Sequence, residues 1–168
     1  YVNQRMALTM DLPSRRETVL DLFDRVRKAC PKPTALRRYD GEYALESEGD
    51  PRRASWPSLR RTSVATGMAI PVDLSEAYAL HRTILRTAPY FLSITPLDVE
   101  CIDLAFGFDL DGPGNHDEAV FDTFLDQSPL AGPLRDGDEL CDVQPMLAFK
   151  LDGDPMTTAV VEIRTRQV

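Results

Sequence analysis

The chain has 168 residues, of which 43% are hydrophobic and 27% charged. This length can bury one sizeable core, so a single globular domain spanning residues 1–168 is the first expectation. No run approaches the roughly 18 apolar residues that a membrane helix needs, so no membrane-spanning helix is expected. The first ten residues lack the basic head and apolar block of a signal peptide. Because the chain begins with Tyr1, the sequence does not show what precedes it.

Charge and cysteine content favour a cytoplasmic protein with protein partners. The net charge is −8, but residues 1–84 carry +3 and residues 85–168 carry −11. Such asymmetry bears on partners and solubility rather than on fold. The three cysteines, Cys30, Cys101 and Cys141, include no close pair. This argues against a disulfide framework and fits the reducing cytoplasm.

The first third of the chain predicts a strand followed by a helix. Apolar residues alternate with polar ones over residues 4–12, which indicates a strand with one buried face. Ser14 and Glu17 have the spacing of a capping box, and helical apolar spacing then continues to about residue 29.

The next segments predict more strands. Residues 35–48 are expected to form a hairpin around Asp40-Gly41, a pair typical of a type I′ turn. Turn residues over 49–57 predict an exposed loop, and 59–70 predict one strand. Within that strand, Gly67 indicates either a bulge or a close approach of another group.

A second helix is predicted over residues 74–88. Asp73 and Glu76 repeat the capping pattern, and apolar residues recur at helical spacing. Pro89 should end the helix, because proline lacks the backbone N–H that an interior position donates.

The most regular stretch of the sequence predicts a long strand over 98–110 and a helix over 116–125. After Glu100, one face of that strand is entirely apolar and is expected to be buried; its residues are Ile102, Leu104, Phe106, Phe108 and Leu110. An acidic, glycine-bearing turn follows, and Asn115 has the position of an N-cap with Glu118 three residues on.

The remainder predicts a hairpin of strands 143–151 and 157–166, with Ala159, Val161 and Ile163 inward. The order strand, capped helix, hairpin then occurs twice, in residues 4–68 and 98–166, joined by the helix over 74–88. The predicted class is therefore α+β, with a mainly antiparallel sheet and helices packed on one face. A duplicated βαββ arrangement is the specific version, and helices over a curved sheet are the alternative.

No catalytic, nucleotide-binding or metal motif is found, so the sequence leans against an enzyme and implies no cofactor. The acidic turn places Asp109, Asp111 and Asp117 at calcium-loop spacing, which makes them weak metal candidates. The match fails because Pro113 stands at the fifth position and Val120 replaces the bidentate Glu. A capped turn explains the same residues.

Paired arginines are the stronger signal for an anionic ligand. Arg37-Arg38 and Arg60-Arg61 lie on predicted strands, where neighbours point to opposite faces. If those strands pair, guanidinium groups from each would cluster, either on the acidic half of the same chain or on an anion. His81 lies on the apolar side of the second helix and is expected to be a hydrogen-bonded core or interface histidine.

Two functional hypotheses follow. The first is a non-enzymatic binding or assembly domain that acts through protein contacts and self-associates, since apolar residues such as Val64, Met68 and Ile70 are expected on outer strand faces. The second is a small-molecule binding protein or enzyme with a pocket between sheet and helices, which would bind an anion. Its candidate ligand residues are Arg37, Arg38, Arg60, Arg61, Tyr78 and His81. Nucleic acid is disfavoured by the net charge of −8.

Overall fold

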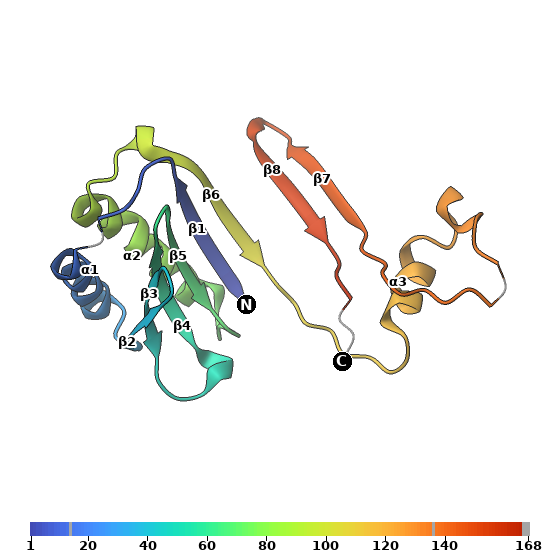
Figure 1. Ribbon diagram of the computed structural model, residues 1–168, viewed down its shortest axis with the longest axis horizontal. Helices are drawn as coiled ribbons and strands as arrows, with labels where there is room; N and C mark the ends of the chain where they lie inside the picture. The colour runs from blue at the N-terminus through green and yellow to red at the C-terminus, as the bar shows by residue number, and fades with distance from the viewer. Residues whose placement is uncertain (14, 136, 166–168) are drawn as a thin grey trace. The chain divides into compact units, whose positions relative to one another are not determined.

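The computed structural model describes residues 1–13, 15–135 and 137–165. Within these residues the chain is α+β, with eight strands in antiparallel sheets and three α-helices, which confirms the predicted fold class (Figure 1). The chain forms two compact units, residues 1–109 and 110–168. The expected single domain and the duplicated βαββ arrangement remain predictions.

The first unit is built on a six-stranded antiparallel sheet with the order β2-β3-β4-β5-β1-β6. Strands β1 and β6 pair directly although they are far apart in sequence, so β6 forms one edge and β2 the other. The strands are β1 (Val2–Leu8), β2 (Pro33–Tyr39), β3 (Glu42–Ser47), β4 (Ser55–Arg60), β5 (Ser63–Met68) and β6 (Val99–Phe106).

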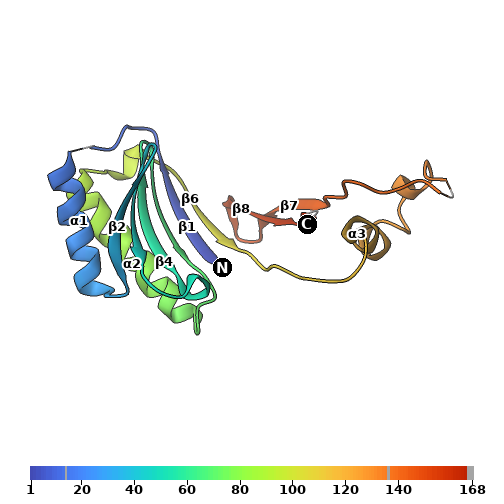
Figure 2. The ribbon, with the colours of Figure 1, turned by 60° about the horizontal axis from the view of Figure 1, so that its bottom comes forward.

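Two helices lie on the same face of this sheet (Figure 2). Helix α1 spans Arg16–Ala29, and helix α2 spans Leu74–Leu92. Both bury an apolar stripe, and Asp73 caps α2 by accepting a hydrogen bond from the Ser75 backbone N–H at 2.9 Å. Position Ser14 of the predicted capping box lies outside the described residues, and the residue before α1, Arg15, makes no side-chain cap.

The core fills the space between the helices and the central strands. Side chains on the helix-facing side of β1, β4 and β5 meet the stripes of both helices, and the most buried members include Leu22, Val26, Val64, Ala77, Leu80, Ile84, Ala88 and Leu92. Each fully buried aliphatic side chain contributes about 1.5–3 kcal/mol relative to exposure. Val64 and Met68 belong to this core, so their assignment to an outer face was wrong.

The second unit contains helix α3 (His116–Phe124) and a two-stranded sheet of β7 (Met146–Leu151) and β8 (Asp154–Glu162). Asn115 caps α3 as predicted, since its side chain accepts hydrogen bonds from the backbone N–H groups of Asp117 and Glu118. The last residue of the predicted final strand, Arg166, lies outside the described residues. Three short 3₁₀ helices complete the described structure: η1 (Pro51–Arg53), η2 (Pro96–Asp98) and η3 (Pro129–Ala131).

Two strand predictions were wrong in the region after residue 49. The predicted loop contains the start of β4, and the predicted strand over 59–70 contains the end of β4, a turn at Arg61-Thr62 and all of β5. Pro57 is the reason for the difference, because proline usually disfavours strands. Here it is buried within β4, opposite Thr66.

Two local predictions about turns and helix ends were also wrong. Helix α2 continues through Pro89 to Leu92 and ends at Ser93, whose φ is 56°. Pro89 removes only its own hydrogen bond to the Leu85 carbonyl, and the chain after it still closes the helix, since Ser93 N–H and Ile94 N–H both donate to the Pro89 carbonyl. In the β2–β3 turn only Gly41 has a positive φ, 71°, so the turn is not type I′.

No helix in the described parts of the chain combines the length and apolarity needed to cross a membrane.

Gly67 marks a close approach, one of its two predicted roles. A Cβ atom there would lie 2.3 Å from Trp56 ring carbons and 2.5 Å from Asn3 Oδ1.

Gly67→Val is expected to lower the free energy of unfolding by about 1–3 kcal/mol, because the added side chain displaces the Trp56 indole from its position over Gly67. Ala65→Val, on the same face of β5, is the control and should change it by less. Urea unfolding followed by Trp56 fluorescence, the only tryptophan signal, measures both, and equal stabilities would contradict the prediction.

Candidate functional site

The predicted arginine cluster is not assembled, because β3 lies between β2 and β4. Arg60 forms an ion pair with Glu42 on β3 at 2.9 Å, and Arg61, in the β4–β5 turn, forms one with Asp11 at 2.9 Å. These partners come from the first unit itself. The alternative in which the arginines pair with the acidic second half is therefore wrong for Arg60 and Arg61.

Arg37 and Arg38 point to opposite faces of β2, as the sequence predicts. Arg37 is opposite Ala44 and lies on the sheet face away from the helices. Arg38 is opposite Tyr43 on the helix-facing side, and its guanidinium carbon lies 5.5 Å from the centroid of the Tyr43 ring. Such a cation–π contact holds the guanidinium in place without neutralising its charge.

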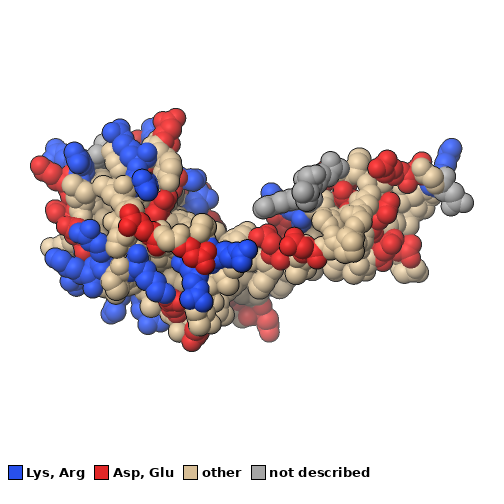
Figure 3. All heavy atoms as spheres, turned by 90° about the horizontal axis from the view of Figure 1, so that it is seen from below, with Lys and Arg blue, Asp and Glu red and all other residues tan. Residues whose placement is uncertain are grey.

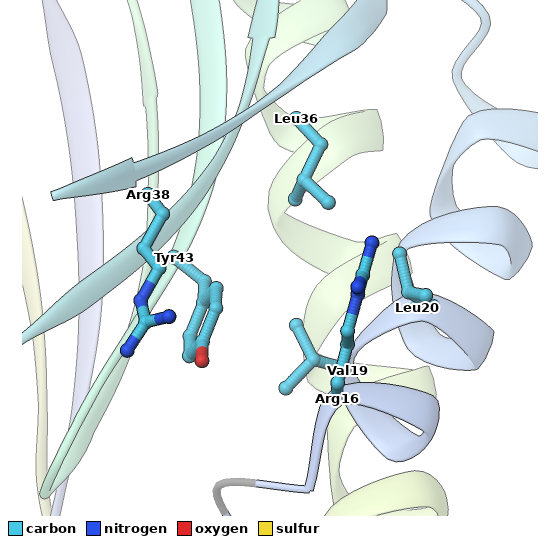
Figure 4. Close-up of a pocket in the computed structure, with 6 residues that line it drawn as sticks. All are labelled: Arg16, Val19, Leu20, Leu36, Arg38 and Tyr43. Carbon is cyan, nitrogen blue, oxygen red and sulfur yellow. The ribbon is translucent and has the colours of Figure 1, made fainter.

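A pocket of about 200 Å³ opens between α1 and the β2–β3 edge of the sheet. Figure 4 shows its walls: Arg16, Val19 and Leu20 of α1 on one side, and Leu36, Arg38 and Tyr43 of the strands on the other. Of the predicted ligand residues, only Arg38 lines it. Arg16 makes no ion pair within the described residues, and both arginine side chains are exposed. The pocket therefore combines two cationic groups with an apolar and aromatic wall.

His81 is the core histidine that its position on α2 predicts. It is buried, and its Nδ1 atom lies 2.5 Å from Thr66 Oγ1 on β5. Its Nε2 atom has no hydrogen-bond partner in the described structure. Burial lowers the pKa of His81, because a charged imidazolium would lose its hydration. Tyr78, one turn earlier, is partly exposed, with its ring 6.4 Å from that of His81.

Asp117, which follows the acidic turn, has a structural role. This carboxylate is buried, and its Oδ1 atom accepts hydrogen bonds from the Val143 backbone N–H at 2.8 Å and the Thr165 hydroxyl at 2.5 Å. Asp109 and Asp111 lie in an exposed segment. In the part of the chain that the structure describes, no three His, Cys, Asp or Glu residues are grouped so as to hold a metal ion.

The largest departure from the sequence prediction is on β6. By register, Ile102, Leu104 and Phe106 lie opposite Met6, Gln4 and Val2, so they share the helix-facing side of the sheet. They were expected to be buried, yet each is between 45 and 54% exposed. The strand also ends at Phe106, which leaves Phe108 and Leu110 outside it and more exposed.

Sheet width explains this exposure. Six strands spaced about 4.8 Å apart form a sheet at least about 24 Å wide, whereas two helices about 10–12 Å in diameter cover about 20–24 Å. The helices thus have no width to spare at the two edges, and helix-facing residues of both β2 and β6 are exposed. We call Ile102, Leu104 and Phe106 the β6 surface. Sequence periodicity predicts that these three residues share one face of a strand. It cannot show whether a helix covers that face, and in the first unit none does.

The two edges of the sheet differ in their protection. Edge β2 carries Pro33, Arg37 and Arg38, residue types that discourage pairing with another strand. Edge β6 carries two acidic residues, Glu100 and Asp103, and Asp103 lies 3.7 Å from Arg5 on the neighbouring strand. The β6 edge is therefore the better template for an added strand.

The charge also differs between the units. Residues 1–109 contain 15 Lys/Arg and 15 Asp/Glu, whereas residues 110–168 contain 4 Lys/Arg and 12 Asp/Glu. Figure 3 shows the contrast, with both signs interspersed over the first unit and acidic side chains dominating the visible face of the second. All of the net charge of −8 thus comes from the second unit.

Comparisons of the chain with known protein families, with characterised proteins and with solved structures found no match.

The buried His81 predicts a pH-dependent stability. Its folded-state pKa is below the ordinary value, so the unfolded chain binds a proton first as pH falls. The free energy of unfolding should decrease below about pH 6.5, by at most about 1.4 kcal/mol per pH unit. His81→Gln should remove this slope between pH 5.5 and 7.5, and His116→Gln should keep it. Urea unfolding across this range provides the measurement, and an unchanged slope in His81→Gln would contradict the assignment.

Proposed function

We propose that the protein is a non-enzymatic assembly domain that self-associates through the β6 surface. The observation that carries the proposal is an apolar strand face, half exposed, beside an edge with free backbone hydrogen-bonding groups. Contiguous exposed apolar surface next to an open edge is typical of protein interaction sites. Covering it would remove three large apolar side chains from water at once.

A second copy of the chain is the occupant that the charges favour. The β6 surface itself is uncharged, so covering it would leave no buried charge without a partner. The nearly neutral first unit also presents no net repulsion to the acidic second unit of another copy. A strongly basic or acidic partner would gain little from the β6 surface, whereas an equally apolar one would gain most.

Self-association is tested by sedimentation velocity of the full chain between 1 and about 100 μM. We expect a concentration-dependent dimer that weakens at least about tenfold in Leu104→Asp, equivalent to about 1.4 kcal/mol. Val72→Asp is the matched control, since Val72 is an exposed aliphatic residue in the loop before α2. A wild-type monomer across the whole range would overturn the proposal, as would equal weakening by both variants.

A second function, binding of a small anion with an apolar part, is supported by the pocket beside α1. Two guanidinium groups could engage a phosphate or carboxylate, while Tyr43, Val19 and Leu36 contact the rest of the ligand. This site differs from the one expected from the sequence, since Arg60, Arg61, Arg37 and His81 do not line it.

Phenyl phosphate, which joins an aromatic ring to a dianion, is a suitable probe for this pocket. Calorimetric titration should give saturable binding that weakens about tenfold in Arg38→Gln, the loss of one charge-assisted contact. Arg37→Gln removes the adjacent charge on the opposite face of β2 and should leave binding unchanged. Equal effects of both substitutions would mean that net charge, not the pocket, determines binding.

A further inference from the structure

The hairpin β7–β8, like strand β6, has an apolar face that is exposed to solvent. Its strands pair with Leu147 opposite Val161 and Phe149 opposite Ala159, so these four side chains share one face. We call them the hairpin face. Leu147, Phe149 and Val161 are between 45 and 62% exposed, so the described residues leave this face uncovered. A two-stranded hairpin is marginally stable in water unless a third strand or another layer covers it.

The free edges of the two elements match in length and chemistry. Strand β6 has eight residues and β8 has nine, and within the described residues each pairs with one neighbour. The interior of β8, residues 156–161, contains no charged residue. Unlike β2, neither edge carries the pair of arginines that would discourage pairing. Addition of a strand to such an edge supplies backbone hydrogen bonds along its whole length.

We propose that the β7–β8 hairpin of a second copy adds to the free edge of β6, so that the hairpin face lies beside the β6 surface on the same side of the extended sheet. This inference rests on the proposed self-association and identifies the segment responsible for it. Exchanged reciprocally, the arrangement gives a two-fold dimer with two identical contacts, each joining β6 of one copy to the hairpin of the other. The six-stranded sheet then continues through β8 and β7 of the partner copy.

Complementation between two defective chains tests this exchange. Leu104→Asp disables β6 but keeps the hairpin, and Phe149→Asp disables the hairpin but keeps β6. Each variant alone should dimerise at least about tenfold more weakly than the wild type. An equimolar mixture should recover a heterodimer, because β6 of the Phe149→Asp chain and the hairpin of the Leu104→Asp chain form one intact contact. Sedimentation with one chain fluorescently labelled detects it.

Controls separate the inference from the broader proposal. Val160→Asp, on the other face of the hairpin, should leave the dimer intact, and Val161→Asp provides a second hairpin variant if Phe149→Asp misfolds by circular dichroism. A dimer that Leu104→Asp weakens but both Phe149→Asp and Val161→Asp leave unchanged would overturn the hairpin exchange while self-association stands. Folded variants whose mixture stays monomeric would also overturn the exchange. A wild-type monomer would overturn both.

Discussion

The limited cover that two helices give to a six-stranded sheet is the constraint on which the rest of the first unit depends. The helices α1 and α2 bury the central strands and create the core around Val64 and Ile84. Because their combined width leaves nothing to spare over that of the sheet, the two edges are left with incomplete packing. At β2 this produces the pocket beside α1. At β6 it produces an exposed apolar face.

The second unit depends on a single buried carboxylate rather than on a layered core. Asp117, in the first turn of α3, accepts hydrogen bonds from Val143, before β7, and from Thr165, after β8. This ties both ends of the hairpin to the helix, while the strands themselves contribute few buried side chains. A hairpin that is held only at its base gains stability from a third strand. In the proposed dimer, β6 of a second copy provides that strand.

Periodicity and capping rules predicted most elements of the fold, because these signals are local. The N-cap at Asn115, the buried stripe containing His81 and the opposite orientations of Arg37 and Arg38 all follow from short-range geometry. The failures concern facts set by long-range packing. Pro57 is accepted within β4, β3 separates the arginine pairs, and the apolar face of β6 lacks a cover. No local pattern shows how many helices cover a sheet, or that Arg16 and Arg38 line the same pocket.

The central claim is that another copy of the chain completes the β6 edge. Hydrogen exchange of the β6 backbone amides as a function of protein concentration tests it most directly. The account predicts that outward-facing amides between Val99 and Phe106 become slower to exchange as concentration rises through the dimerisation range, while the amides of β5 do not change. Exchange rates in β6 that are the same at every concentration, whether fast or slow, would contradict it.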